Sequence, residues 1–362
     1  MATAASGAHE TTEERLVYAM DKVRLAVIGA GGQCTQSLMP GIPFIPEIEL
    51  VAVCDLKREL AERNARNFGA PAVYTDFELM LKEQKPDAAM VIGPPQMHEE
   101  VGLAVLQSDC HLFIEKPASP TVEGAKRLAD AAVAAGKIGQ VGHMMRHADP
   151  IRIAWDISHA EEFGDILSVE SKYSTWPTGV IPPGHGWGEP DEDWTYMLVQ
   201  GGHPIDLMRH FLGPIVRVAG RKSTGHGNAK AYQVAVESRE GRVGFLNLQD
   251  SFSGWSTKLE VMGDGQGIVT VDDLGCVRYR RGEKRTPTES DTNGTSAYVW
   301  QPHHVLKAWQ RAGYGVQLRN FARGILEGKP TVPSLWDAWR NLVVAQCIVE
   351  SCATARMVEV PQ

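Results

Sequence analysis

The chain has 362 residues, more than the roughly 250–300 that one hydrophobic core usually supports, so its length predicts two domains. Hydrophobic residues make up 43% and charged residues 22% of the sequence, which is ordinary globular usage and excludes a disordered or collagen-like chain. The formal charge of −8 argues against nucleic acid as the main partner, and no run reaches the ~18 apolar residues of a membrane-spanning helix.

The first half of the chain alternates short apolar strands with helical stretches. It begins with a polar tail, residues 1–21, that has neither the basic nor the apolar region of a signal peptide. Strands are predicted at Val23–Ile28, Leu50–Cys54, Ala72–Tyr74, Ala88–Ile92, His111–Ile114 and Ile138–Val141. Helices are predicted at Leu56–Asn67, Phe77–Glu83, His98–Gln107 and Val122–Ala135. This alternation is typical of βαβ units, which build a parallel sheet.

The second half has a different order of elements. A helix near Ile151–Phe163 and a strand at Ile166–Ser174 precede a stretch rich in Pro, Gly and Trp and a short helix near Pro204–Phe211. Strands then follow at Val216–Arg221, Tyr232–Ser238, Val243–Gln249, Thr257–Met262, Ile268–Val271 and Val277–Arg280. The last predicted helices are Val316–Leu326 and Leu335–Ala353. Consecutive strands with short turns indicate a mostly antiparallel sheet.

These patterns predict an α/β protein. An N-terminal Rossmann domain with a doubly wound parallel sheet is expected over residues 22–147. An α+β domain with a mostly antiparallel open sheet is expected over residues 148–362, for substrate binding and oligomerisation. The six cysteines are scattered, without the paired spacing of a zinc site, which favours a reduced, cytoplasmic compartment.

A glycine turn follows the first strand directly. It comprises Gly29, Ala30, Gly31, Gly32, Gln33 and Cys34. Glycines at such a turn let the backbone approach a pyrophosphate, whose charge is met by N–H groups at the next helix N-terminus. The turn therefore predicts a dinucleotide site, and Cys34 in the third glycine position predicts slightly looser packing of helix on strand.

Asp55 ends the second strand, where a carboxylate can accept hydrogen bonds from the adenosine ribose and repel a 2′-phosphate. This favours NAD as the cofactor. Lys57 and Arg58 come just after it and can meet a 2′-phosphate, so NADP stays open. Asp55 is also placed to cap the helix that follows.

Glu115-Lys116-Pro117 ends the fifth strand, at the edge of the sheet where ligands bind. Oxidation of a secondary alcohol needs a base for the hydroxyl proton and a donor or cation for the oxygen. Lys116 follows an apolar run, and the proline after it favours an extended backbone at this position. It is thus a candidate reacting group.

With these motifs the chain resembles the glucose-fructose oxidoreductase, inositol dehydrogenase and rhizopine-catabolism (Gfo/Idh/MocA) family of NAD(P)-dependent oxidoreductases. The resemblance runs from about Lys22 to the C-terminus. It includes the glycine turn with Asp55, then Pro94-Pro95 with His98, Glu115-Lys116-Pro117, Gly142 with Arg146, Gly202-His203-Pro204-Ile205-Asp206, and Gly313-Tyr314 through Phe321 with Pro330.

The resemblance implies roles at matching positions. Lys116 corresponds to the lysine that contacts the reacting hydroxyl and the nicotinamide, and His203 to the histidine that acts as acid/base. Cofactor contacts are implied for Pro94, Pro95, His98, Glu115 and Lys116. An unperturbed histidine titrates near neutral pH, which suits it to accept and return a proton.

One position departs from the family pattern. Many relatives have an aspartate four residues before this histidine, whereas Val199 stands there and cannot hydrogen-bond through its side chain. Asp206, about one helical turn after His203, is expected to orient it or to bind a sugar hydroxyl. His203, Asp206 and His210 share one helical face in a metal-like spacing, but the nicotinamide interpretation already uses the first two, and no metal is predicted.

A substrate loop is predicted between the strand at 166–174 and the His203 helix. Trp176, Trp187 and Trp194 can pack on the apolar faces of a sugar ring, or can simply anchor the loop to the core. Arg146 is a further candidate substrate ligand, for an anionic group. His185, Asp191 and Asp193 are weaker candidates.

The leading hypothesis is hydride transfer between a nicotinamide and a secondary hydroxyl of a sugar, inositol or glycoside. A redox-neutral, NAD-dependent glycoside hydrolase is the alternative, because some relatives oxidise, eliminate, add water and reduce again. A non-catalytic NAD-binding regulator is the third. The resemblance also implies a homo-dimer or homo-tetramer.

Overall fold

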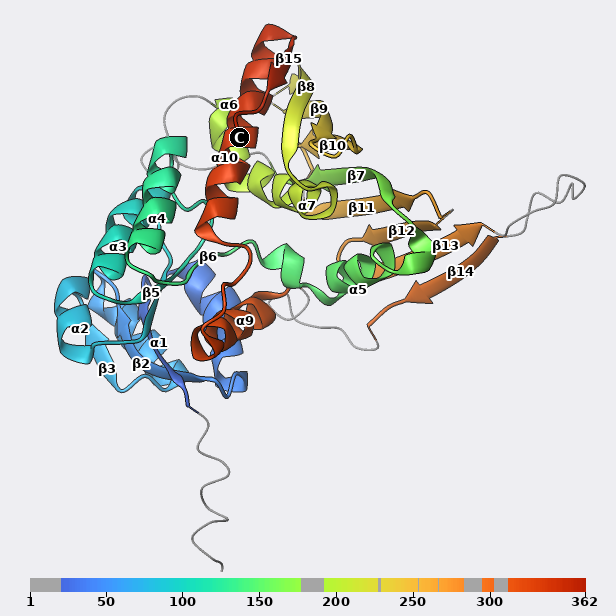
Figure 1. Ribbon diagram of the computed structural model, residues 1–362. Helices are drawn as coiled ribbons and strands as arrows, with labels where there is room; N and C mark the ends of the chain where they lie inside the picture. The colour runs from blue at the N-terminus through green and yellow to red at the C-terminus, as the bar shows by residue number, and fades with distance from the viewer. Residues whose placement is uncertain are drawn as a thin grey trace, which may run out of the picture.

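Two β-sheets, one in each half of the chain, organise the computed structural model (Figure 1). The structure describes residues 21–176, 192–226, 229–252, 254–265, 267–282, 295–302 and 312–362. Every helix among these residues is too short or too polar to cross a membrane.

The first sheet has six parallel strands in the order β3-β2-β1-β4-β5-β6, which confirms the predicted Rossmann fold. The strands are β1 Val23–Ile28, β2 Ile48–Cys54, β3 Ala72–Tyr74, β4 Ala88–Val91, β5 His111–Ile114 and β6 Gly139–Val141. Most of their side chains outside the edge strand β3 are buried, because helices cover both faces of a parallel sheet.

Four helices connect these strands: α1 Arg58–Phe68, α2 Phe77–Gln84, α3 Pro95–Gln107 and α4 Val122–Ala134. The side chain of Asp76 caps α2 by accepting the N–H groups of Glu78 and Leu79, and Thr121 caps α4 through the N–H of Gly124. These local signals explain why the predicted helices nearly match the observed ones.

The segment after the glycine turn differs from the expected regular helix. It forms a five-residue π turn, Cys34–Leu38, and then a 3₁₀ turn, Met39–Phe44. Pro40 and Pro43 lie in this 3₁₀ turn, and without N–H groups they cannot donate the bonds of an α-helix.

The second sheet has nine strands in the order β14-β13-β12-β11-β7-β10-β9-β8-β15. Neighbours run antiparallel except β7 and β10, so the prediction of a mostly antiparallel sheet is confirmed. The strands are β7 Ile166–Ser174, β8 Ile215–Thr224, β9 Lys230–Ser238, β10 Val243–Gln249, β11 Ser256–Gly263, β12 Gly267–Asp272, β13 Cys276–Gly282, β14 Thr295–Trp300 and β15 Met357–Glu359. The sequence prediction did not include β14 and β15.

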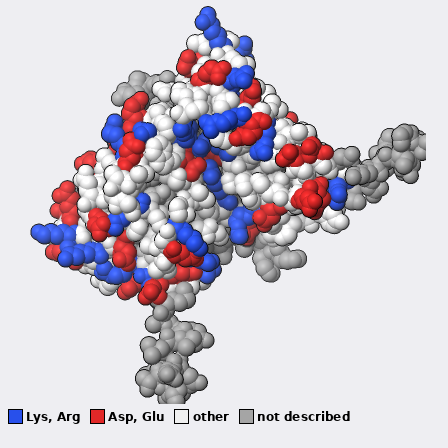
Figure 2. All heavy atoms as spheres, viewed as in Figure 1, with Lys and Arg blue, Asp and Glu red and all other residues white. Residues whose placement is uncertain are grey.

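Helices cover one face of this sheet. They are α5 Asp149–Ser158, α7 Gly202–Leu212 and α10 Leu335–Thr354, and the short α6 Glu192–Tyr196 precedes α7. On the opposite face Val243 and Phe245 of β10 are 53% and 41% exposed. Figure 2 shows Lys and Arg interspersed with Asp and Glu on the face in view, which lacks the continuous basic stripe typical of nucleic-acid-binding surfaces.

The last two helices tie the halves together. Leu318 and Phe321 of α9 (Tyr314–Glu327) join the core of the first sheet, where the rings of Phe321 and Phe113 lie 5.8 Å apart. In Figure 1, α10 runs between α4 of the Rossmann half and the β8 edge of the second sheet. Both helices were expected in the second domain, yet each packs on the first.

Gly29 is the position in the first sheet least able to accept a side chain. Its φ is +96°, and a Cβ would lie 1.8 Å from the carbonyl oxygen of Ile92. We expect Gly29→Ala to lower the free energy of unfolding by at least about 2 kcal/mol, since both strain and a backbone clash arise. Urea denaturation without cofactor measures this loss of stability.

Gly32→Ala is the control. A Cβ there meets nothing within 4 Å, so the free energy of unfolding stays equal or rises by up to about 1 kcal/mol. Equal stabilities for the two variants would contradict the geometry.

Candidate functional site

The predicted glycine turn and Asp55 are held together by hydrogen bonds. Asp55 Oδ2 accepts the N–H of Ala30 at 2.7 Å, and Asp55 Oδ1 accepts the N–H of Lys57 at 2.8 Å. The buried Asn64 side chain donates to the carbonyl of Ala30 at 2.9 Å. These bonds fix the turn beside the end of β2. Because α1 starts three residues after Asp55, the Asp55 side chain does not cap this helix, contrary to the prediction.

Two features of this region suit a dinucleotide. A Cβ placed on Gly31 or on Gly32 would meet nothing within 4 Å, so the space above the turn is open to a phosphate group. Glu115 Oε1 is buried without a hydrogen-bond partner, as expected of an acceptor reserved for a ligand. The donor and acceptor set therefore fits NAD.

The other predicted cofactor residues surround this turn. Lys57 and Arg58 are exposed beside Asp55, and Arg58 pairs with Glu62 at 2.8 Å. Gln33 donates to the hydroxyl of Tyr314, a half-buried residue at the start of α9, at 3.1 Å. Cys34 is fully buried beneath the turn.

His98 connects two loops at the carboxyl edge of the sheet. Pro94 and Pro95 start α3, and His98 Nε2 accepts the N–H of Gly93 at 2.9 Å. Its Nδ1–H then donates to the carbonyl of Pro117 at 2.7 Å. Burial lowers the pKa of His98 to about 4, so it is neutral. The side chain of His98 is 1% exposed, so it supports the predicted cofactor loops from the protein interior.

Glu115 lies against Gly142, which follows β6. A Cβ on Gly142 would be 2.7 Å from Glu115 Oε1, so glycine is needed to make room for the carboxyl group. Burial raises the pKa of Glu115 to about 7, although the neighbouring Lys116 opposes this rise. The backbone N–H of Lys116 donates to Glu115 Oε2 at 3.1 Å.

Lys116 reaches from the first sheet to the second half of the chain. Its Nζ donates to the backbone carbonyl of Val199 at 2.6 Å, in the π turn Met197–Gly201 that precedes α7. Burial lowers the pKa of Lys116, and Glu115 opposes the shift. The position that lacks the family's aspartate therefore still accepts a hydrogen bond, through its main chain.

His203 lies on the first turn of α7 and is 5% exposed. Its Nδ1 is buried without a hydrogen-bond partner. Burial holds the pKa of His203 well below its usual range, and the positive charge of Lys116 adds to this effect. The imidazole is therefore neutral at pH 7 and able to accept a proton.

Arg146 and Asp206 form a buried, two-pronged ion pair. Arg146 Nε and Nη2 donate to the two carboxylate oxygens of Asp206, each at 2.6 Å. The side chains are 8% and 1% exposed, and Arg146 Nη2 also lies 3.4 Å from Asp337 Oδ1 of α10. Each group is therefore bound to the other. The candidate roles of both as substrate ligands, and of Asp206 in orienting His203, stay predictions.

Sequence reasoning missed His143 and Asn341. His143 Nε2 lies 3.0 Å from Asn341 Nδ2, which also donates to Asp206 Oδ1 at 2.9 Å. The rings of His143 and His203 are 6.0 Å apart. The place of His143 just after β6 was a readable signal, but Asn341 in the middle of α10 gave none.

A small cavity lies among these groups. Its lining includes Lys116, Pro117, His143, Gly202 and Asn341. It brings together the carboxyl ends of β5 and β6, the start of α7 and the middle of α10. Lys116 lines this cavity at the junction of the two halves, and His203 follows Gly202 of the lining and is close enough for the charge of Lys116 to lower its pKa.

The structure describes two of the three predicted tryptophans, Trp176 and Trp194. Trp176 is 51% exposed just after β7, whereas Trp194 in α6 donates to the carbonyl of Pro120 at 3.0 Å. Trp187, His185 and Asp191 lie outside the described residues. Asp193 accepts the hydroxyl of Tyr232 at 2.8 Å and pairs with Lys222 and Lys230, so it holds α6 on the second sheet.

The metal-like spacing of α7 does not form a ligand cluster. Asp206 is bound to Arg146, and His210 stacks on Trp155 with the rings 4.0 Å apart. Within the part of the chain that the structure describes, no three His, Cys, Asp or Glu side chains are grouped to hold a metal ion.

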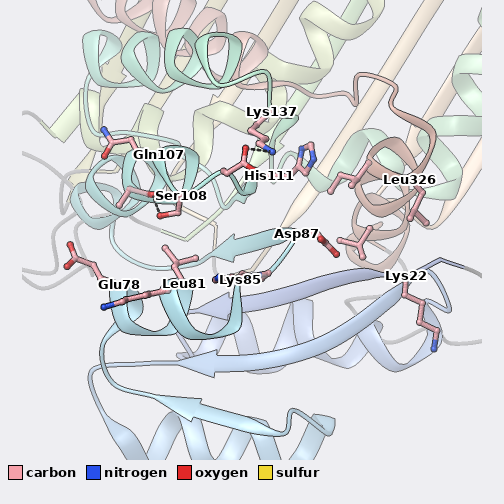
Figure 3. A pocket seen from close by; sticks show the side chains of 16 residues that line it. Lys22, Glu78, Leu81, Lys85, Asp87, Gln107, Ser108, His111, Lys137 and Leu326 are labelled. Carbon is pink, nitrogen blue, oxygen red and sulfur yellow. Dashed lines mark hydrogen bonds and ion pairs between the residues drawn. The ribbon is translucent and has the colours of Figure 1, made fainter.

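A larger hollow, about 960 Å³, lies elsewhere (Figure 3). It is at the amino ends of β1, β4 and β5, between Lys22, Lys85, Asp87, His111 and Lys137. Ligands of such sheets bind at the carboxyl ends of the strands. The candidate site is therefore the smaller junction around Lys116 and His203.

Comparison with known proteins places both halves in one family. Residues 23–143 match the description "Oxidoreductase family, NAD-binding Rossmann fold", and residues 159–360 match "Oxidoreductase family, C-terminal alpha/beta domain". The two matches together include both sheets.

Individual relatives are distant but extend over most of the chain. Inositol 2-dehydrogenase from Klebsiella pneumoniae is 25% identical over 352 residues, 93% of this chain and 96% of that protein. D-glucoside 3-dehydrogenase from Escherichia coli is 31% identical over 213 residues, 58% of each chain. The structure of a dehydrogenase from Chromobacterium violaceum has a TM-score of 0.83 at 25% identity and covers 93% of this chain and 97% of its own. Levoglucosan dehydrogenase, solved with NADH and L-sorbose, shares the fold with a TM-score of 0.80 at 18% identity, over 95% of this chain and all of its own.

The buried ion pair leads to a stability prediction. Arg146→Met leaves the carboxylate of Asp206 without its cation, so we expect the free energy of unfolding to fall by about 3–5 kcal/mol. Urea denaturation measures the loss. Arg152→Met is the control, since Arg152 is 56% exposed and pairs with Asp149 at 3.5 Å; its change stays below about 1 kcal/mol. Similar losses in both variants would contradict the role of burial.

Buried histidines lead to a pH prediction. His98, His143 and His147 have pKa values lowered by burial to about 4, whereas an unfolded histidine has about 6.5. Between these values the unfolded state binds more protons. The contribution of these histidines to stability is therefore complete above pH 6.5 and is lost as the pH falls towards 4, by up to about 1.4 kcal/mol per pH unit for each histidine. Urea midpoints from pH 7.5 to 4.5 measure the slope, and a flat profile would contradict it.

Proposed function

The chain belongs to the Gfo/Idh/MocA family of NAD-binding oxidoreductases, and on that premise we propose that it transfers a hydride between NAD and a secondary hydroxyl of a sugar, inositol or glycoside. The observation that carries the proposal is the meeting of Lys116 with the turn that starts the His203 helix. A hydroxyl at this junction has a donor and a proton acceptor beside it.

We propose distinct roles for the two side chains. His203, neutral because of burial and Lys116, accepts the hydroxyl proton during oxidation and returns it during reduction. Lys116 Nζ, held by the carbonyl of Val199, donates to the oxygen on which negative charge develops. Bound NAD supplies the hydride acceptor or donor. Neither role requires Asp206, whose carboxylate is bound to Arg146.

The substrate class rests on similarity and on aromatic side chains. Relatives named inositol 2-dehydrogenase and D-glucoside 3-dehydrogenase support a polyol or sugar. Trp176, 51% exposed beside the end of β7, is the described tryptophan free to lie against a sugar ring. We assign Arg146 and Asp206 to the support of the site, because both are buried in their ion pair.

We propose cofactor roles for the residues that the sequence suggested. The glycine turn Gly29 to Cys34 and Asp55 bind the dinucleotide, and Glu115 Oε1 accepts from it. Asp55 favours NAD, and Lys57 and Arg58 on the rim leave room for NADP. Pro94, Pro95 and His98 shape the loops around it.

Three further proposals concern the whole molecule. The domain division at residues 22–147 and 148–362 follows the two sheets, with α9 and α10 returning to the first. Val243 and Phe245 on the uncovered face of the second sheet support assembly into a homo-dimer or homo-tetramer. The six cysteines are free thiols, which supports a cytoplasmic location.

A substrate panel tests the reaction. With NAD and a set of sugars, inositols and glycosides, we expect NADH absorbance at 340 nm for at least one compound. His203→Ala should lower kcat by about 10²–10⁴-fold, because the acid/base group is lost. Lys116→Ala should lower kcat while NAD binding, followed by fluorescence titration, persists.

Other outcomes separate the alternatives. Release of the aglycone without net NADH would identify a redox-neutral hydrolase. NAD binding with neither activity would indicate a regulator. His210→Ala serves as the matched histidine control on the same helix, stacked on Trp155, and its kcat should stay within about threefold of the parent.

A further inference from the structure

The site contains a second histidine whose protonation is fixed by its neighbours. Asn341 on α10 is hydrogen-bonded on two sides. Arg209 Nη1 donates to Asn341 Oδ1 at 2.8 Å, and Asn341 Nδ2 donates to Asp206 Oδ1 at 2.9 Å. A guanidinium can only donate and an ionised carboxylate can only accept. Both contacts therefore require the same orientation of the Asn341 amide.

The orientation of Asn341 decides the tautomer of His143. Asn341 Nδ2 has two hydrogens: one bonds Asp206, and the other faces His143 Nε2 at 3.0 Å. His143 Nε2 must therefore accept, and a neutral His143 carries its proton on Nδ1. Burial lowers the pKa of His143 to about 4, so the ring is neutral at pH 7. His143 is thus a fixed Nδ1–H donor.

That donor has no protein partner. His143 is 4% exposed, and its Nδ1 is buried without a hydrogen bond. An unmade bond at a buried donor costs about 1–3 kcal/mol. Three charged residues, Arg209, Asp206 and Arg146, surround the network that holds the ring in this state. A buried donor held in this state without a protein partner indicates that a ligand supplies the acceptor.

The location of His143 identifies that ligand. His143 follows β6, next to β5, so it occupies the same carboxyl edge of the sheet as Lys116. Lys116 and His143 line one cavity, and the ring of His203 lies 6.0 Å from that of His143 with the planes at 84°. The reacting oxygen of the proposed function, which Lys116 and His203 would contact, is therefore the acceptor assigned to this donor.

We propose that His143 is a catalytic residue that donates its Nδ1–H to the reacting oxygen of the substrate. It acts as a neutral electrophile beside the charged Lys116, while His203 remains the acid/base. No bond is formed or broken at His143: its hydrogen bond strengthens as the oxygen gains negative charge during hydride transfer. This role rests on the proposed dehydrogenase function.

Two near-isosteric variants separate catalysis from structure. An Asn side chain places its amide near the Nδ1 of histidine, whereas a Gln side chain reaches the position of Nε2. His143→Asn therefore keeps the donor and loses the link to Asn341, and His143→Gln does the opposite. We expect His143→Gln to lower kcat by about 10²–10³-fold with little change in KM, as for the loss of one oxyanion donor. His143→Asn should stay within about tenfold of the parent. The reverse order would show that His143 only supports Asn341 and would overturn the proposal.

A measurement on the unmodified protein is independent of turnover. Long-range ¹H–¹⁵N NMR of the NAD-saturated enzyme reports histidine tautomers, and the His143 signals are assigned by their loss in His143→Asn. We expect the proton on Nδ1, and a proton on Nε2 would overturn the proposal. If no polyol is oxidised but the Nδ1–H form is found, the dehydrogenase function fails and the tautomer stands. If turnover occurs and His143→Gln keeps more than half of the parent kcat, the function stands and this inference fails.

Discussion

The ion pair between Arg146 and Asp206 is the interaction on which the site depends. Arg146 follows β6 of the first sheet, and Asp206 lies on α7, which carries His203. With Asp337 and Arg209 nearby, the pair connects β6, α7 and α10 in a region closed to water. An ion pair so deeply buried adds little net stability, but it tolerates only one arrangement of its partners, because an unpaired buried charge is costly. The pair therefore links the end of the first sheet to α7 and α10 at the candidate site.

The charges of the site follow from this arrangement. Lys116 crosses the junction to the carbonyl of Val199, and its positive charge, together with burial, keeps His203 and His143 neutral. Glu115, with its pKa raised to about 7 by burial, lies beside Lys116. In the proposed mechanism, one charged donor, one neutral acid/base and one neutral fixed donor surround the hydroxyl oxygen without additional carboxylates. That mechanism does not need an aspartate at the position of Val199.

Most of the architecture could be predicted from local patterns. The six strands of the first sheet follow from apolar runs, turn residues and helix caps such as Asp76 and Thr121. The same patterns predict the order of the loops that carry the candidate site residues. The errors have physical causes. Pro40 and Pro43 prevent the regular helix expected after the glycine turn, and the short edge strand β15 is recognisable only once it pairs with β8.

The sequence by itself determined the Rossmann turn, Asp55, and the pair Lys116 and His203, because each of these depends on neighbours a few residues away or on a motif. Tertiary structure alone decided what the polar groups do to one another. Arg146 was a candidate ligand for an anionic substrate group, and Asp206 was expected to orient His203 or to bind a sugar hydroxyl. The tertiary structure pairs these two residues with each other across 60 positions of the chain. Asn341 reaches His143 across 198 positions and sets its tautomer. No local pattern encodes such contacts, since hydrogen-bond partners distant in sequence are chosen only when the two halves pack.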